Sequence, residues 1–207
     1  MDDIHVELIS LGKSYGGRAL FAGLDAAVGP GECLVVRGPN GSGKSTLLKI
    51  IAGLVRPSAG QSRVVKAGKA LDNEQRRGVI GLISPEMLFY QPLTALENMT
   101  FFLRVMGHGL SREAILHYLE RAGLGLHADR PVGLYSTGMR QRLKFALLMA
   151  LDAPLLLLDE PGSNLDADGR SMASRFLREA LEGGRTVVLA SNEQWETDYG
   201  TRTILLA

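Results

Sequence analysis

The sequence is poor in cysteine and carries almost no excess of charge of either sign. Its 207 residues include a single cysteine, Cys33, which excludes an internal disulfide and fits a reducing compartment. Cys33 opens an apolar run that ends at Val36, so a buried structural thiol is favoured over a reactive one. The formal net charge is +1, and the composition therefore predicts no general attraction to nucleic acid.

The sequence also has no apolar run long enough to span a bilayer. The most apolar region, residues 145–160, is interrupted by Asp152 and Pro154. The chain opens with Met1, Asp2 and Asp3 and no apolar core follows them, so we expect no signal peptide. We therefore expect a soluble cytoplasmic protein that acts at a membrane only through a separate partner.

Short apolar runs alternate with helical patterns along most of the chain. Helical patterns begin near Ser45, Ser111, Ser136 and Asp168. The runs that predict strands are Ile4 to Leu11, Cys33 to Val36, Val79 to Ile83, Leu155 to Leu158, Thr186 to Ala190 and Thr203 to Leu206. This alternation predicts an α/β fold with a mostly parallel core sheet covered on both faces.

Two parts of the chain depart from this alternation. Up to about Val28 the sequence has short strands and Gly-rich turns, which predict an antiparallel N-terminal β subdomain. Residues 89–130 show no convincing strand, and behind Ser111 their apolar residues follow helical spacing, which predicts a helical insertion. These apolar residues are Ile115, Leu116, Leu119 and Ala122. We expect one domain over residues 1–207, with a catalytic core of about 1–88 and 131–207 and a helical subdomain of about 89–130.

The segment GPNGSGKST fits the pattern G-x-x-x-x-G-K-[ST] and lies between a predicted strand and a predicted helix. Glycines let backbone N–H groups wrap phosphate oxygens, and the helix N-terminus adds partial positive charge. Lys44 is expected to reach the β- and γ-phosphates of a nucleotide, and Ser45 to bind Mg²⁺. The alternative is a chance Gly-rich turn, which the strand–loop–helix context disfavours. The expected nucleotide contacts are Gly38, Pro39, Asn40, Gly41, Ser42, Gly43, Lys44, Ser45 and Thr46.

The segment LLLLDEP is a buried strand that ends in two acids, Asp159 and Glu160. Carboxylates at the end of a core strand cost desolvation free energy unless a cation or hydrogen bonds offset it. Asp159 suits a contact with Mg²⁺, and Glu160 suits a general base that aligns an attacking water. The alternative is a pair of acids that cap a neighbouring helix, which the phosphate loop makes less attractive.

The order of four segments resembles the nucleotide-binding subunit of ABC transporters over essentially the whole chain. The segments are GPNGSGKST, YSTGMRQR, LLLLDEP and GSNLD. YSTGMRQR, Tyr135 to Arg142, matches the signature segment that separates this family from other P-loop proteins. The resemblance implies a P-loop NTPase fold of the ABC ATPase type that binds ATP and Mg²⁺. It also implies that Ser136 and Gly138 face the γ-phosphate held by a second subunit, so that two chains enclose two ATPs head to tail.

The same resemblance implies further contacts and partners. Tyr15 stands where the family has an aromatic residue that stacks on adenine, although a simple turn tyrosine is the alternative. Residues 163–166 match the loop that crosses the dimer seam. Separate transmembrane permease subunits are implied, with the chain as a homodimer or heterodimer on the inner face of the plasma membrane. Some aromatic residues of the helical insertion belong to its core, and an exposed remnant beside the loop that carries Glu86 would form a groove for a coupling helix of a membrane subunit.

The sequence departs from the family at three places. Asn192 stands where the family carries a switch histidine; an asparagine amide donates a hydrogen bond but does not become cationic near neutral pH. The signature carries Thr137 and Met139 in place of a glycine and a glutamine. In place of the glutamine expected before the helical insertion the sequence has Glu86, or Pro85 if the alignment contains no gap. We favour Glu86, whose carboxylate could still approach Mg²⁺. We hypothesise that ATP binding is ordinary and that hydrolysis is slow or needs a partner.

The resemblance is strongest to short exporter-type subunits, either of the ABC-2 type or of the haem exporter of cytochrome c maturation. A non-transport ABC ATPase acting on ribosomes or DNA is a competing class. It is disfavoured by the single cassette, the absence of a long coiled-coil insertion and the near-neutral charge. A nucleotide-binding subunit with weak ATPase activity and a regulatory role is the third class, and Asn192 keeps it open.

Overall fold

A computed structural model describes residues 3–207 of the chain. They fold into two compact units. The first comprises residues 3–82, Ala153–Glu160 and Leu177–Ala207, and the second comprises Ile83–Asp152 and Pro161–Phe176. No helix among residues 3–207 combines the length and the hydrophobicity needed to cross a membrane.

The first unit contains two sheets. The antiparallel sheet has the order β2-β1-β4-β5, and the other sheet has the order β6-β7-β8-β3-β9, in which β7, β8, β3 and β9 pair in parallel. The strands are β1 Ile4–Tyr15, β2 Arg18–Val28, β3 Cys33–Arg37, β4 Ala59–Lys66, β5 Lys69–Ala70, β6 Ile80–Ile83, β7 Leu155–Asp159, β8 Thr186–Ala190 and β9 Arg202–Leu205. These sheets confirm the predicted α/β class with an antiparallel N-terminal addition.

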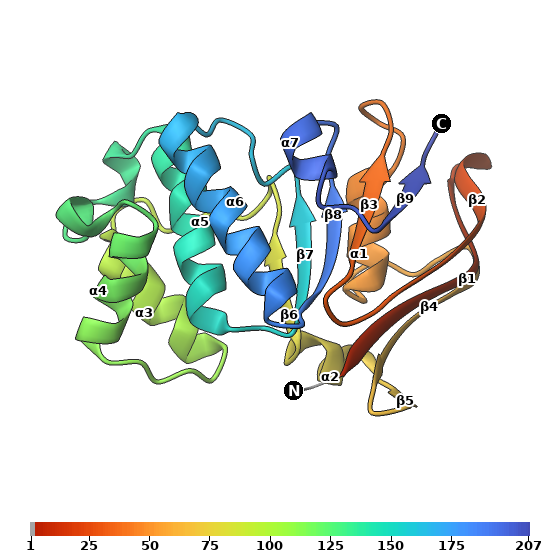
Figure 1. Ribbon diagram of the computed structural model, residues 1–207, viewed down its shortest axis with the longest axis horizontal. Helices are drawn as coiled ribbons and strands as arrows, with labels where there is room; N and C mark the ends of the chain where they lie inside the picture. The colour runs from red at the N-terminus through yellow and green to blue at the C-terminus, as the bar shows by residue number, and fades with distance from the viewer. Residues whose placement is uncertain (1–2) are drawn as a thin grey trace. The chain divides into compact units, whose positions relative to one another are not determined.

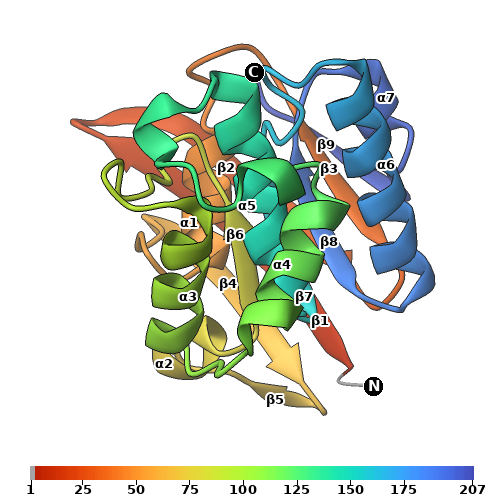
Figure 2. The same cartoon turned by 90° about the vertical axis from the view of Figure 1, so that its left-hand side faces the viewer.

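The helices lie between the strands along the chain. They are α1 Lys44–Ile51, α2 Asn73–Arg77, α3 Ala95–Val105, α4 Arg112–Arg121, α5 Thr137–Leu151, α6 Ala167–Glu182 and α7 Gln194–Thr197, with short 3₁₀ helices at Gly125–His127 and Val132–Leu134. Figure 2 shows α3, α4 and α5 side by side in the second unit. Ser111 and Ser136 cap α4 and α5 through their side-chain oxygens, as predicted.

The core of the first unit lies between its two sheets. Helix α1 packs against β7 and β8 of the parallel sheet and against β4 of the antiparallel sheet. Strands β7 and β8 are buried at every position, which explains the apolar runs 155–158 and 187–190 within them. This packing fixes the direction in which β3 leads into α1, and therefore fixes the loop between them.

Several elements differ from the sequence-based expectation. The predicted short N-terminal strands are instead two long ones of 12 and 11 residues, joined by the turn Gly16–Gly17. Strands β4 and β5 and helix α2 were not predicted, because the exposed β4 lacks a regular apolar alternation. Helix α3 begins with a capping box in which the Thr94 side chain accepts from the Glu97 N–H and Glu97 accepts from the Thr94 N–H.

Candidate functional site

The loop between β3 and α1 is closed by the lysine at its end. Lys44 is 5% exposed, and its Nζ donates hydrogen bonds to the carbonyl oxygens of Gly38 at 2.7 Å and Pro39 at 3.3 Å. The Ser42 N–H also donates to the Pro39 carbonyl at 3.2 Å. The buried ammonium group is therefore held by carbonyls from the start of its own loop, and a charged ligand must draw it away from them.

Two glycines of this loop have a steric reason to be glycine. Gly38 has a φ of 154°, and a Cβ there would lie 2.5 Å from the Leu206 carbonyl oxygen and 2.6 Å from Ser42 Oγ. Gly43 caps α1 with a φ of 102°, and a Cβ there would lie 2.7 Å from Leu20. Both positions combine a positive φ with a close approach that only glycine allows. The glycine pattern read from the sequence is thus built into the packing around the loop.

Asp159 is the last residue of β7 and Glu160 follows it, on the edge of the sheet where β3 and β8 also end. Figure 1 shows β7, β8 and β3 in the same sheet, and their parallel pairing places their carboxyl ends at this common edge. Asp159 is 4% exposed, and burial raises the pKa of its carboxyl group. A hydrogen bond with the Ser45 side chain and the charge of Lys44 partly oppose that rise. The structure therefore brings together Ser45 and Asp159, the two predicted magnesium ligands of this unit.

Glu160 has a different environment from its neighbour. Its φ is 46°, in the left-handed region, and its N–H donates to the Ala190 carbonyl at 2.8 Å. Its side chain is 44% exposed, with Oε1 lying 3.9 Å from Lys44 Nζ. A buried carboxyl group and a solvent-accessible one thus stand side by side, which suits one for metal binding and the other for proton transfer.

Asn192 lies beyond the end of β8 and contacts the start of the loop. Its Oδ1 accepts a hydrogen bond from the Gly38 N–H at 3.2 Å, and its Nδ2 donates to the Gly38 carbonyl at 2.9 Å. The residue at the predicted switch position is therefore engaged with the phosphate loop through both ends of its amide.

A cavity of about 420 Å³ joins Tyr15 to the loop. It is lined by Tyr15, Arg18 and the loop residues Asn40, Gly41 and Ser42, among others. The predicted adenine-stacking residue and the predicted phosphate loop therefore share one cavity. Tyr15 is 55% exposed, which leaves its ring accessible to a planar ligand.

Sequence reasoning missed two basic residues beside this cavity. Arg18 is paired with Tyr15 across the two-residue turn Gly16–Gly17, and the Lys13 ammonium lies 4.6 Å from the Tyr15 ring centroid. The signal for Arg18 was present, since two glycines between strand-forming residues predict a tight hairpin that aligns its flanking residues. Lys13 shares a face of β1 with Tyr15 by the two-residue period of a strand.

The loop residues fit a nucleoside triphosphate with magnesium. Ser42 Oγ is buried without a hydrogen-bond partner among the residues that the structure describes, and a phosphate oxygen would satisfy it. Ser45 and Asp159 offer the oxygen ligands that Mg²⁺ prefers, with the remaining positions left to phosphate and water. A bound Mg²⁺ would supply positive charge to the phosphate oxygens. This fit rests on one loop, one strand end and one buried lysine.

The signature segment lies in the second unit at the start of α5. The Ser136 side chain accepts from the Met139 N–H at 3.1 Å, and a Cβ at Gly138 would lie 2.8 Å from the Asn164 carbonyl oxygen. The segment is therefore packed against the loop predicted to cross a dimer seam. Arg142 and Asp166 form an ion pair that joins α5 to the same loop.

Asp166 is held in its ionised form by its neighbours. Its Oδ1 accepts the Gly169 N–H at 2.9 Å, and this bond and the Arg142 guanidinium lower the pKa of the carboxyl group. Gln141 Nε2 donates to the Pro161 carbonyl at 2.7 Å, a second tie between α5 and the segment that follows β7.

Glu86 and Pro85 are exposed in the loop after β6, where the Ser84 carbonyl accepts a hydrogen bond of 2.7 Å from Lys144 Nζ.

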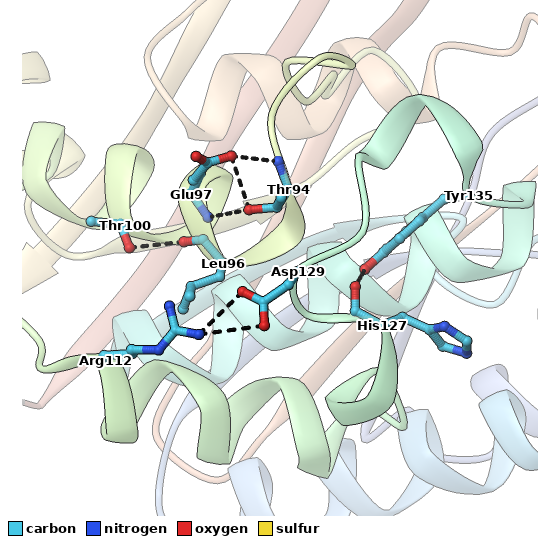
Figure 3. Close-up of polar contacts among 8 residues, drawn as sticks. All are labelled: Thr94, Leu96, Glu97, Thr100, Arg112, His127, Asp129 and Tyr135. Carbon is cyan, nitrogen blue, oxygen red and sulfur yellow. Dashed lines mark hydrogen bonds and ion pairs between the residues drawn. The ribbon is translucent and has the colours of Figure 1, made fainter.

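A groove of about 700 Å³ lies between α3 and α4 of the second unit. Its apolar lining includes Phe101, which is 41% exposed, and Val105, which is 69% exposed. Figure 3 shows its polar margin, where Arg112 pairs with Asp129 at 3.1 Å and Glu97 bonds to Thr94. Phe101 is therefore an exposed aromatic residue of the helical insertion, but the lining of this groove does not include the loop that carries Glu86, beside which we expected it.

Comparison with known proteins shows similarity over nearly the whole chain. A family model described as ABC transporter matches residues 21–163. The chain is 37% identical over 196 residues to the cytochrome c biogenesis ATP-binding export protein CcmA of Pseudomonas putida (strain GB-1), covering 93% of this chain and 91% of that protein. It is 33% identical over 200 residues to the Nod factor export ATP-binding protein I of Rhizobium sp. (strain N33), covering 96% of this chain and 66% of that protein.

A third relative is the daunorubicin resistance ATP-binding protein DrrA2 of Streptomyces coeruleorubidus, 35% identical over 96% of this chain and 62% of that protein. The chain thus spans somewhat less than two thirds of the Rhizobium and Streptomyces relatives. Among solved structures, the dimeric post-hydrolysis state of an ATP-binding cassette bound to ADP and Pi matches with a TM-score of 0.84 and 29% identity, covering 97% of this chain and 94% of that one.

Proposed function

The chain belongs to the ABC transporter family, and we propose that it is the ATP-binding and ATP-hydrolysing subunit of an exporter of this family. The observation that carries the proposal is the shared edge at which Lys44, Asp159 and Glu160 meet around one loop. The names of the relatives support an export role, since each describes an ATP-binding protein of export or drug resistance.

In this proposal each residue has one task. Ser42 and the backbone of the loop bind phosphate oxygens, and Lys44 leaves the Gly38 and Pro39 carbonyls to pair with the β- and γ-phosphates. Ser45 and Asp159 hold Mg²⁺. Glu160, open to solvent beside them, accepts a proton from the attacking water. The nucleotide base stacks on Tyr15.

We place the second half of each site on another copy or on a related subunit. Ser136 and Gly138, at the N-terminal end of α5, would meet the γ-phosphate of the opposing chain, where the helix dipole favours an anion. The solved cassette that this fold matches is dimeric, which supports the assembly of two chains. The expected form is a homodimer or heterodimer on the inner face of the membrane, with transmembrane permease subunits as its other partners.

We propose the groove between α3 and α4 as the place where a permease subunit docks. Phe101 and Val105 would contact the apolar side of the permease segment. Phe101→Glu should leave ATP binding intact and lower the stimulation of hydrolysis by the permease. Leu126→Glu, at a fully exposed site on the 3₁₀ helix Gly125–His127, is the matched control. Equal stimulation of wild type and Phe101→Glu would remove the groove from consideration.

We also propose that hydrolysis is slow without a partner, because Asn192 replaces the histidine of the family. Asn192→His should raise the turnover number for Mg-ATP, since an imidazolium adds a charge-assisted hydrogen bond to phosphate. An unchanged or lower turnover number would count against this idea. A nucleotide-binding subunit with weak ATPase activity is the second candidate, favoured by the engagement of the Asn192 amide with Gly38. Assays with and without the permease separate it from a working motor.

A further inference from the structure

The pairing between Asn192 and Gly38 uses both side-chain polar atoms of Asn192 and both backbone polar atoms of Gly38. The amide of Asn192 accepts from the Gly38 N–H and donates to the Gly38 carbonyl, at 3.2 Å and 2.9 Å. A residue whose backbone offers both a donor and an acceptor fixes the orientation of the amide, because only one orientation satisfies both. The two residues are 154 positions apart in sequence, so this contact ties the end of β8 to the start of the phosphate loop.

Gly38 is also the tightest point of that loop. A Cβ on it would lie 2.5 Å from the Leu206 carbonyl oxygen and 2.6 Å from Ser42 Oγ, so a side chain at this position would collide with both groups. The same Gly38 carbonyl accepts the Lys44 hydrogen bond of 2.7 Å. A carbonyl oxygen has two lone pairs, and here Lys44 and Asn192 occupy both.

From this geometry we infer that Asn192 is a positioning residue of the phosphate loop, acting on nucleotide affinity through the backbone N–H and carbonyl of Gly38. The inference rests on the proposed function, in which Lys44 leaves the Gly38 carbonyl for the phosphates. When it leaves, the Asn192 amide still donates to that carbonyl, so the carbonyl keeps a hydrogen-bond partner. The Gly38 N–H likewise stays fixed, and the loop keeps its shape while its lysine moves.

This role differs from that of a group that touches the γ-phosphate. A residue that holds the loop supports the binding of ATP and ADP alike, because both nucleotides occupy the loop with their α- and β-phosphates. A residue that contacts the γ-phosphate favours ATP alone. The ratio of the two affinities therefore separates the two roles.

The test measures the dissociation constants of Mg-ATP and Mg-ADP by isothermal titration calorimetry for wild type and Asn192→Ala. Loss of the two hydrogen bonds should weaken both nucleotides by the same factor, roughly three- to tenfold. Gln194→Ala is the matched control: this nearby amide bonds to Asp198 at 2.6 Å, and its loss should change neither constant. Asn192→Asp keeps an acceptor for the Gly38 N–H but turns a second oxygen toward the Gly38 carbonyl, so it should bind both nucleotides no better than Asn192→Ala.

A second measurement needs no nucleotide. Hydrogen exchange of the Gly38 N–H in the nucleotide-free chain should be faster in Asn192→Ala than in wild type and unchanged in Gln194→Ala. Weakened ATP binding with unchanged ADP binding would overturn the inference in favour of a γ-phosphate contact, and unchanged values for both would also overturn it. If wild type bound neither nucleotide, the proposed function would fail, and the positioning role would fail with it.

Discussion

Replacing Glu160 by glutamine should stop hydrolysis while leaving the fold nearly unchanged. The substitution keeps the size of the side chain and the N–H bond to the Ala190 carbonyl, and removes only the charge. Glu160 lies 3.9 Å from Lys44 and is 44% exposed, and an ion pair in such a position contributes about 0.5 kcal/mol. Lys44 keeps its bonds to Gly38 and Pro39, so no buried charge loses all its partners. For a chain of this size we expect the melting temperature to change by about 2 °C or less.

The effect on the reaction should be far larger. General base catalysis contributes roughly 10²–10⁴-fold to a rate, so Glu160→Gln should lower the turnover number at least ~100-fold, or about 2.7 kcal/mol in activation free energy. The assay is steady-state phosphate release under saturating Mg-ATP, with size-exclusion chromatography of the ATP-loaded variant, which should elute as a dimer. Glu193→Gln changes an exposed acid just beyond the end of β8 and should hydrolyse ATP like wild type. If Glu160→Gln retained more than a tenth of the wild-type turnover number, Glu160 would not be the base. Elution of the ATP-loaded variant only as a monomer would contradict a dimer in which two chains enclose two ATPs.

Three further predictions concern ionisable groups. Burial raises the pKa of Asp159, so ionisation of this carboxyl group lowers the stability of the nucleotide-free fold as pH rises through that pKa. Asp159→Asn should therefore raise the melting temperature at pH 8, and it should abolish the extra stabilisation that Mg²⁺ gives to ATP binding. The Gly169 N–H and Arg142 lower the pKa of Asp166, so the contribution of this carboxylate to stability is present above its pKa in the unfolded chain and is lost as pH falls through its pKa in the folded chain. Urea titrations at decreasing pH should therefore show a smaller loss of stability in Asp166→Asn than in wild type. Burial raises the pKa of Cys33 to about 12, so iodoacetamide at pH 8 should label this thiol in urea but not in the native chain, as read by mass spectrometry.

The parts of the fold that could be predicted from sequence are those with a local cause. Buried strands β7 and β8 contain the apolar runs 155–158 and 187–190, and the caps of α4 and α5 are serines that precede residues with helical spacing. The glycine–lysine loop is predictable because its pattern needs only one strand, one turn and one helix. Strand β4 could not be found in this way, since half of its residues are exposed and it owes its strand conformation to pairing with β1.

The candidate site likewise contains features with a local cause, which the sequence predicts, and features that depend on tertiary packing, which it does not. Which residue types are present at the strand ends could be read from the sequence, because parallel strands bring their carboxyl ends to one edge. The different environments of Asp159 and Glu160 could not, since burial of the first and exposure of the second depend on packing across the sheet. Arg18 lies between these cases: a Gly-Gly turn predicts that it faces Tyr15, but only the fold shows that both line a cavity with the phosphate loop.

Asn192 shows why a missing family residue is not by itself a lost function. From sequence, the change from histidine removes a side chain that can be cationic near neutral pH, and this alone predicts slower hydrolysis. In the fold, the carboxamide offers an acceptor and a donor whose hydrogen-bonding directions are nearly parallel, and they meet the backbone N–H and carbonyl of Gly38. Neutral imidazole also has one donor and one acceptor, but their hydrogen-bonding directions diverge across the ring, so they cannot meet the N–H and the carbonyl of one residue together. Asparagine at this position therefore gives up a side chain that can be cationic and gains two hydrogen bonds to the backbone of Gly38. Asn192→His should accordingly raise the turnover number while weakening the binding of both ATP and ADP.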